Sequence, residues 1–204
     1  MQPHNLNTRK ITICIKNMVS NSCVRIVREE LERTGFIKVL HIELGIADIQ
    51  YDAQVFSQEN INQILIRNGF SLIADKGEKM VEKIKTSIIQ LIYYGNNTNS
   101  LVRNSDYLSQ KLNMPYLQLS KLFSDHTGTT LEKYIIMVKM ERIKELITYD
   151  EMTLSEIAYL MGYSSVQYLS NQFKQITGVS VTEYKDQLHK SRKPLSSLLE
   201  PPSI

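Results

Sequence analysis

The feature that most constrains this chain is a gapless internal repeat in its C-terminal half. Residues 119–134 read LSKLFSDHTGTTLEKY, and residues 169–184 read LSNQFKQITGVSVTEY. The identical pairs are Leu119/Leu169, Ser120/Ser170, Phe123/Phe173, Thr127/Thr177, Gly128/Gly178 and Tyr134/Tyr184. Because no strand pattern interrupts this region, the repeat indicates one helical supersecondary unit that is used twice.

Each copy follows the physical logic of a short buried helix. The leucine and the phenylalanine are four residues apart, so they lie on the same helical face and are expected to be buried. Gly128 and Gly178 follow these helices, where glycine adopts the left-handed conformation without steric cost. The sequence therefore predicts that both helices end at their glycine.

A second helix precedes the later copy, within the segment TLSEIAYLMGYSS. Thr153 and Glu156 have the spacing of a capping box, which marks a helix start. Gly162 permits a tight turn, and Ser164 is predicted to cap the helix that follows. This segment and the repeat together predict a helix-turn-helix unit.

The earlier copy is preceded by a matching segment, SDYLSQKLNMPY. Ser105 is predicted to cap its first helix, and Asn113 takes the turn position because asparagine tolerates a positive φ. Pro115 suits the first turn of the next helix. Residues 130–148 contain no helix breaker, so they are predicted to form one helix that connects the two units.

The segment SEIAYLMGYSSVQYLSNQFKQITGVSVTEYK, with KMERIKELI before it, resembles the DNA-binding domain of AraC/XylS-family bacterial regulators. The resemblance covers residues 100–189, and Asn113 and Lys139 depart from the usual glycine and arginine. It implies an all-α domain over 77–189 with two helix-turn-helix units. It also implies a sequence-specific transcription regulator whose partners are double-stranded DNA and RNA polymerase.

The connecting helix has a length that suits two adjacent DNA grooves. Nineteen residues at about 1.5 Å each span roughly 28 Å, near the ~34 Å between successive major grooves. We therefore predict that the two recognition helices read successive major grooves. The predicted base-contacting residues are Leu117, Gln118, Ser120, Lys121, Val166, Gln167, Ser170 and Asn171. The predicted phosphate-contacting residues are Lys139, Arg142 and Lys174.

The first 76 residues have a different pattern. Isoleucines alternate with polar residues over 11–15, and further strand signals occur at 39–44, 47–51 and 71–74. Helical patterns lie between them, over about 22–35 and 58–68. The order β-α-β-β-α-β predicts an α+β, ferredoxin-like domain over 1–76. Residues 190–204, rich in serine and proline, are predicted to be a disordered tail.

The segments IKNMVSNSCVRIVREEL and NGFSLI resemble a heavy-metal-associated domain of the copper-chaperone type. That family holds a soft cation with two thiolates in a CxxC motif. Here Ser20 replaces the first cysteine and only Cys23 is kept, while Cys14 lies on a strand. We expect no metal at this degenerate site. At a helix N-terminus Cys23 is a candidate redox residue, and the alternative is an inert, half-buried thiol.

Charge and composition limit the classes of function that this chain can have. Residues 96–190 contain ten Lys and Arg residues and ten Asp and Glu residues, so a helical bundle that binds a protein is an alternative. Two cysteines and the short apolar run at 11–15 predict a cytoplasmic protein without a signal peptide or membrane span. The histidines lie in no catalytic motif, so neither an enzyme nor a cofactor is expected.

Two functions from different classes follow from these patterns. The first is a transcription regulator whose N-terminal domain senses a signal or forms a homodimer. The second is a metal-trafficking or redox protein whose helical half docks a protein partner. The repeat and the missing CxxC cysteine favour the first.

Overall fold

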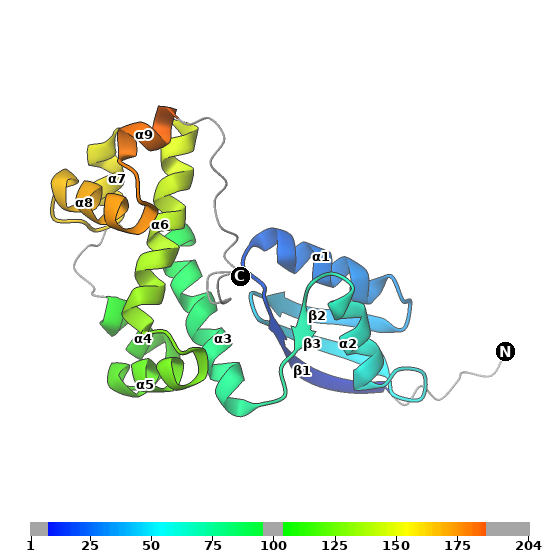
Figure 1. Ribbon diagram of the computed structural model, residues 1–204. Helices are drawn as coiled ribbons and strands as arrows, with labels where there is room; N and C mark the ends of the chain where they lie inside the picture. Colours follow the sequence, from blue (N-terminus) through cyan, green and yellow to red (C-terminus); the bar gives the residue numbers. More distant parts are fainter. Residues whose placement is uncertain (1–7, 96–103, 187–204) are drawn as a thin grey trace. The chain divides into compact units, whose positions relative to one another are not determined.

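The computed structural model describes residues 8–95 and 104–186, which form parts of two compact units (Figure 1). The units comprise residues 1–86 and 87–204. The predicted tail at 190–204 lies outside the described residues. Each unit has its own hydrophobic core, and each is described by itself below.

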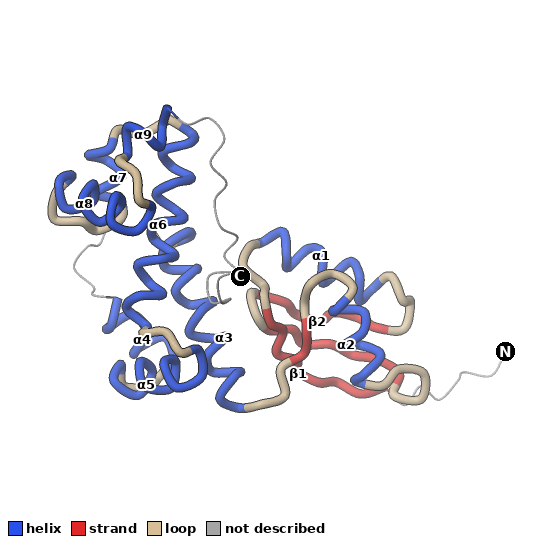
Figure 2. Tube along the Cα trace, viewed as in Figure 1, coloured by secondary structure: helices blue, strands red, loops and turns tan. Residues whose placement is uncertain are grey.

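The N-terminal unit contains a four-stranded sheet and two helices (Figure 2). Its elements are β1 (Thr8–Lys16), α1 (Asn21–Glu32), β2 (Ile37–Glu43), β3 (Ile46–Asp52), α2 (Gln58–Ile66) and β4 (Ser71–Leu72). The strand order is β2-β3-β1-β4, and every neighbouring pair is antiparallel. The order of strands and helices is the one that the sequence predicts.

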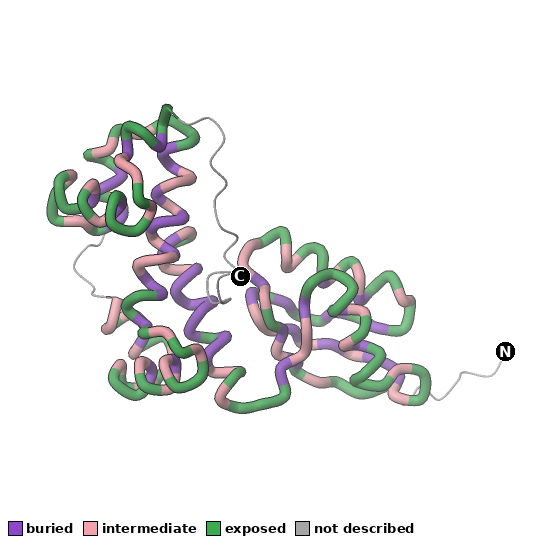
Figure 3. The backbone as a smooth tube through the Cα atoms, viewed as in Figure 1, coloured by how far each residue is buried: buried purple, intermediate pink, exposed green. Residues whose placement is uncertain are grey.

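The core of this unit follows the alternation seen in the sequence. Ile13 and Ile15 of β1 are buried, whereas Cys14 between them is half-buried. Both helices bury one face, which includes Val27 in α1 and Ile61 in α2 (Figure 3). Period-2 burial in the strand and a buried face on each helix are the pattern of a sheet covered by helices.

The edge strand β2 is protected against pairing with another strand. A β-bulge interrupts its register between Val39 and His41. The backbone N–H of Val39 donates to Glu32 Oε1 at 3.2 Å, and Arg28 Nη1 donates to the Val39 carbonyl at 3.4 Å. Bulges and charged side chains at an edge disfavour edge-to-edge association.

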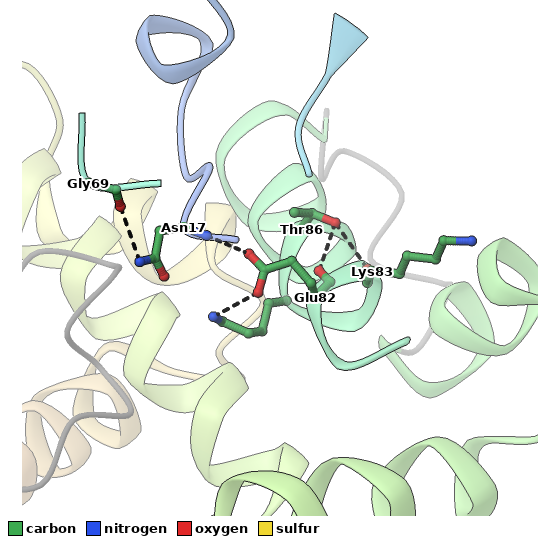
Figure 4. A network of polar contacts seen from close by, with 6 residues as sticks. Asn17, Gly69, Glu82, Lys83 and Thr86 are labelled. Carbon is green, nitrogen blue, oxygen red and sulfur yellow. Dashed lines mark hydrogen bonds and ion pairs between the residues drawn. The ribbon is translucent and has the colours of Figure 1, made fainter. Parts of the chain in front are cut away.

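Helix α3 (Lys76–Ile89) contacts two loops of this unit, the one after β1 and the turn between β2 and β3. Asn17, in the loop after β1, has a positive φ of 71° and donates its backbone N–H to Glu82 Oε1 at 3.1 Å. The Asn17 side chain donates to the Gly69 carbonyl at 3.4 Å (Figure 4). Glu82 also pairs with Lys85 at 3.1 Å, and both side chains are buried. Glu82 thus ties the loop after β1 to α3.

A close backbone approach adds to this contact. Gly45, in the β2–β3 turn, has a φ of 81°, and a Cβ placed on it would lie 3.1 Å from Thr86 Cγ2. Only glycine meets both demands without strain. Because α3 packs against this unit as far as Thr86, the units divide at Thr86/Ser87, ten residues beyond the boundary predicted from the sequence.

In the described residues of the C-terminal unit, the regular secondary structure is all helical. Helix α3 continues into a π-helical turn, η1 (Gln90–Tyr94). The other helices are α4 (Asn104–Leu112), α5 (Tyr116–Thr127), α6 (Leu131–Tyr149), α7 (Leu154–Leu160), α8 (Val166–Thr177) and α9 (Val181–Asp186). Helices α4 and α5 lie near the start of α6, and α7, α8 and α9 lie near its end (Figure 1).

The repeated segments fold into the same junction twice. The Thr127 hydroxyl donates to the carbonyls of Phe123 and Thr129, at 2.8 and 3.1 Å. The Thr177 hydroxyl donates to those of Phe173 and Val179, at 2.8 and 3.0 Å. The glycine after each threonine has a left-handed φ, 67° at Gly128 and 79° at Gly178. The predicted glycine stops are therefore confirmed.

In each copy of the repeat, the phenylalanine ring contacts the ring of the last tyrosine. Phe123 and Tyr134 have ring centroids 5.3 Å apart, and Phe173 and Tyr184 have centroids 5.4 Å apart. Both phenylalanines are completely buried. The closing tyrosine of each repeat therefore holds the next helix, α6 or α9, against the helix that carries the phenylalanine.

The helix caps match the sequence in part. Thr153 and Glu156 form the predicted capping box, and Asn113 has the predicted positive φ of 49°. Two of the expected caps are wrong. Ser165, not Ser164, caps α8, and Ser105 is the second residue of α4 rather than its cap. The second turn is longer than the first: two residues separate Asn113 from α5, while three separate Gly162 from α8.

We predict that the Glu82 contact stabilises the N-terminal unit strongly. Glu82→Ala leaves Lys85 buried without its carboxylate and removes the acceptor of Asn17, so it should cost about 3–5 kcal/mol. The exposed neighbour Lys83 is the matched control, and Lys83→Ala should change stability by less than about 0.5 kcal/mol. Urea unfolding followed by circular dichroism measures both. Equal stability of the two variants would contradict the assigned role of Glu82.

We also predict that the two buried phenylalanines contribute alike. Phe123→Ala and Phe173→Ala should each lower the free energy of unfolding by about 3–5 kcal/mol, because each leaves a cavity. Ile176→Ala, at an exposed position of α8, is the control and should have little effect. An unchanged melting temperature for either phenylalanine variant would show that the buried faces are wrongly assigned.

Candidate nucleic-acid interface

The second helix of each helix-turn-helix unit presents a polar face to solvent. On α5, Leu117, Gln118 and Lys121 are exposed, with Leu117 83% exposed, and Ser120 is half-buried. On α8, Gln167 and Asn171 are exposed, while Val166 and Ser170 are half-buried. Leu119, Phe123, Leu169 and Phe173 point into the core. The structure thus leaves all eight predicted base-contacting residues at least partly accessible.

Two of these residues are bonded to each other. Gln167 Nε2 donates to Asn171 Oδ1 at 2.9 Å, one helical turn apart on α8. The pair leaves Gln167 Oε1 as an acceptor and Asn171 Nδ2 as a donor. Adenine presents the complementary groups in the major groove, the N6 amino group and the N7 acceptor. The two amides can therefore act as one recognition unit.

The three residues predicted to contact phosphate are placed very differently. Lys174 is exposed on α8, one turn beyond Ser170 and Asn171. Lys139 is half-buried on α6, and its Nζ donates to the Met161 carbonyl at 2.8 Å. Arg142 has only 24% of its side chain exposed and pairs with Glu145 at 2.8 Å. Among these three, Lys174 is the one that is exposed to solvent.

Lys139 and Arg142 instead hold helices of their own unit together. The Lys139 ammonium lies 5.6 Å from the centre of the Tyr163 ring, and burial lowers the pKa of Lys139. The Arg142 guanidinium lies 5.1 Å from the centre of the Tyr93 ring in η1. The sequence marks these residues as cations on a connecting helix, but it does not reveal that their heads face inward.

The sequence does not single out four residues beside the recognition helices. The Tyr116 hydroxyl donates to Glu132 Oε1 at 2.9 Å and so ties α5 to α6. The Tyr163 hydroxyl donates to Gln172 Oε1 at 2.5 Å and ties the second turn to α8. Burial raises the pKa of Tyr163, and at Tyr116 the Glu132 contact adds to the same effect. A tyrosine just before or at the start of each recognition helix is the signal that could have found them.

These side chains line one groove of about 430 Å³ in the C-terminal unit. Its walls come from α4, α5, α6, the second turn and α8, and Glu132 and Lys139 both belong to its α6 side. Positions seven residues apart lie on the same face of a helix. One face of α6 therefore contacts both helix-turn-helix units through polar side chains.

Ser20, which precedes α1, and Cys23, in its first turn, are the two positions of the degenerate metal site predicted from the sequence. Cys23 Sγ lies 3.4 Å from Ser20 Oγ, and both residues are half-buried. Met18 is completely buried, which agrees with a core residue. Over residues 8–95 and 104–186, no three His, Cys, Asp or Glu side chains are grouped as a metal site would require. In the same residues, no helix has the length and apolar character to span a membrane.

A helix-turn-helix domain model matches residues 108–187. Over 100 residues the chain is 26% identical to the xylose operon regulatory protein of Escherichia coli strain K12, covering 49% of this chain and 26% of that protein. It is 28% identical over 136 residues to the probable transcriptional regulator LumQ of Photobacterium leiognathi, covering 66% and 53%. The chain thus spans about a quarter to a half of these relatives.

Among solved structures, the C-terminal domain of AraT, a response regulator from Geobacillus stearothermophilus, is similar with a TM-score of 0.46. The identity is 23%, and the match covers 57% of this chain and 92% of that one. The domain match and the regulator relatives agree with the repeated units and their exposed helices. Residues 108–187 thus match a helix-turn-helix domain, and the relatives that share this part of the chain are described as an operon regulatory protein and a probable transcriptional regulator.

Proposed function

We propose that the whole chain is a sequence-specific transcription regulator that reads a non-palindromic DNA site through α5 and α8. The observation that carries this proposal is the pair of similar helices that present polar faces from opposite ends of α6. Because α6 has nineteen residues, about 28 Å separates its ends, close to the spacing of successive major grooves. One chain can therefore engage two grooves.

We assign specificity chiefly to α8. Gln167 and Asn171 share one hydrogen bond and offer an acceptor and a donor outward, which suits adenine. Leu117, Val166, Gln118, Ser120, Ser170 and Lys121 complete the proposed base-contacting set. Lys174 supplies a phosphate contact. Since the C-terminal half carries balanced charge, non-specific binding should be weak and specific contacts should dominate.

The N-terminal unit is assigned a sensing or dimerising role on a ferredoxin-like fold. Its element order and antiparallel strand order β2-β3-β1-β4 support that fold. The protected edge at β2 argues against dimerisation through that strand. A regulator of this kind acts on bacterial chromosomal DNA in the cytoplasm and requires contact with RNA polymerase if it activates transcription.

The first test of this proposal is the readout by α8. Genomic fragments selected by binding define a cognate site. Gln167→Ala or Asn171→Ala should then weaken cognate binding by up to about 1–3 kcal/mol and change binding to random DNA little. Because the two amides are bonded to each other, the double variant should lose less than the sum of the single losses. Fluorescence anisotropy on both DNAs provides the measurement.

Lys174→Ala provides the contrasting pattern. It should weaken binding to cognate and random DNA nearly equally, and it should reduce the salt slope by about one unit because one phosphate contact is lost. Lys133→Ala, at an exposed position of α6, is the control. If all three α8 variants bind cognate DNA like the wild type, α8 is not a reader and the proposal fails for the second unit.

The second test concerns metal at the N-terminal unit. We expect the wild type to bind Cu(I) or zinc poorly, because one thiolate is a weak soft-metal site. Ser20→Cys should raise the affinity by restoring the CxxC spacing, whereas Ser22→Cys, with the wrong spacing, should not. Competition with a chelator measures all three. Tight binding by the wild type that Cys23→Ala abolishes would overturn this expectation.

A further inference from the structure

A cation of α6, Lys139, contacts the second helix-turn-helix turn. Lys139 Nζ donates to the carbonyl of Met161, the residue that ends α7. The same ammonium lies over the Tyr163 ring, and a Cβ added to Gly162 would lie 3.9 Å from it. Lys139 therefore faces three consecutive residues of the turn. Cations stabilise the last carbonyls of a helix, because these have no partner within the helix.

Tyr163 connects this turn to the recognition helix α8. The Tyr163 hydroxyl is bonded to Gln172 of α8, and the Tyr163 and Tyr168 rings lie 5.8 Å apart. Lys139 thus fixes residues 161–163 against α6, and Tyr163 connects them to α8. Gln172 and Tyr168 lie on α8 beside the predicted reading face, so they orient the helix without occupying that face.

The first unit is attached in a different way. Tyr116, the first residue of α5, is bonded directly to Glu132 of α6. Three residues (113–115) join α4 to α5, whereas five (161–165) join α7 to α8, so α5 follows α4 more closely. The longer second turn has two more residues whose dihedral angles must be restrained. A contact from α6 to that turn supplies the restraint.

We propose that Lys139 is a positioning residue that sets the spacing and angle between the two recognition helices, and so selects the distance between the two half-sites on DNA. This inference rests on the proposed DNA readout. It replaces the phosphate contact expected from the sequence with a contact inside the domain. The affinity for each half-site alone is set by α5 or α8, whereas the affinity for both together depends on their relative placement.

The test compares Lys139→Met with the wild type on a set of DNA sites. The cognate site is varied by inserting or deleting one base pair between the half-sites, which rotates one half-site by about 35°. The wild type should lose at least tenfold in affinity on the altered sites. Lys139→Met should bind the cognate site about tenfold more weakly and should discriminate between spacings by less than about threefold.

Two control variants distinguish a positioning role from a direct phosphate contact. Lys139→Arg keeps a cation that reaches the carbonyl and should retain the spacing preference. Lys133→Met removes an exposed cation from the same helix and should behave like the wild type. If Lys139 contacts phosphate instead, Lys139→Met will weaken binding to every site equally and lower the salt slope by about one unit. That outcome overturns the proposal.

A readout without DNA keeps this proposal distinct from the proposed function. Amide hydrogen exchange of the free protein should be at least tenfold faster at Tyr163 and in the first turn of α8 in Lys139→Met. Exchange in α5 should be unchanged. If exchange at Tyr163 is unchanged as well, Lys139 does not restrain the second turn, whatever the result with DNA. If exchange changes but the wild type binds no DNA, the proposed function fails while the restraint of α8 stands.

Discussion

The C-terminal half depends on one helix that is buried on nearly all sides. Each helix-turn-helix unit is too small to form a hydrophobic core of its own, so both bury their apolar side chains against α6. The buried residues of α6 are Leu131, Tyr134, Ile135, Val138, Met140, Glu141, Ile143, Leu146 and Ile147. They are not confined to a single stripe, because different parts of the unit pack against different faces. Its two ends therefore support two similar units.

Packing against shared helices also explains why the two copies of the repeat are identical at only a few positions. The threonine, the glycine and the aromatic pair determine how a recognition helix ends and how the next helix packs on it. Leu119 and Leu169 are also identical and both are buried in the core, and Ser120 and Ser170 are identical and half-buried. Identity is thus kept at the junction and in the core, while most exposed positions differ, as Lys121 and Asn171 do.

The sequence predicts the order of the elements and both buried faces, because these depend on periodicity and on local signals such as the capping box at Thr153. It does not reveal contacts between partners distant in sequence. The contacts of Glu82 and Thr86 with loops of the sheet are of this kind. The contacts of Lys139 and Arg142 are as well, because the helices around a long flexible side chain decide where its charged group lies. The exposed face of α8, by contrast, follows directly from its buried one.

Under the proposed DNA readout, the hydrogen bond between Gln167 and Asn171 would also constrain how the DNA target changes during evolution. Replacing either residue alone leaves the other amide without this partner and disturbs the donor and acceptor that the pair presents. A single substitution would then weaken recognition rather than redirect it. New specificity at this part of α8 would require two coordinated substitutions, whereas α5, whose exposed positions have no such bond among the described contacts, could diverge one residue at a time.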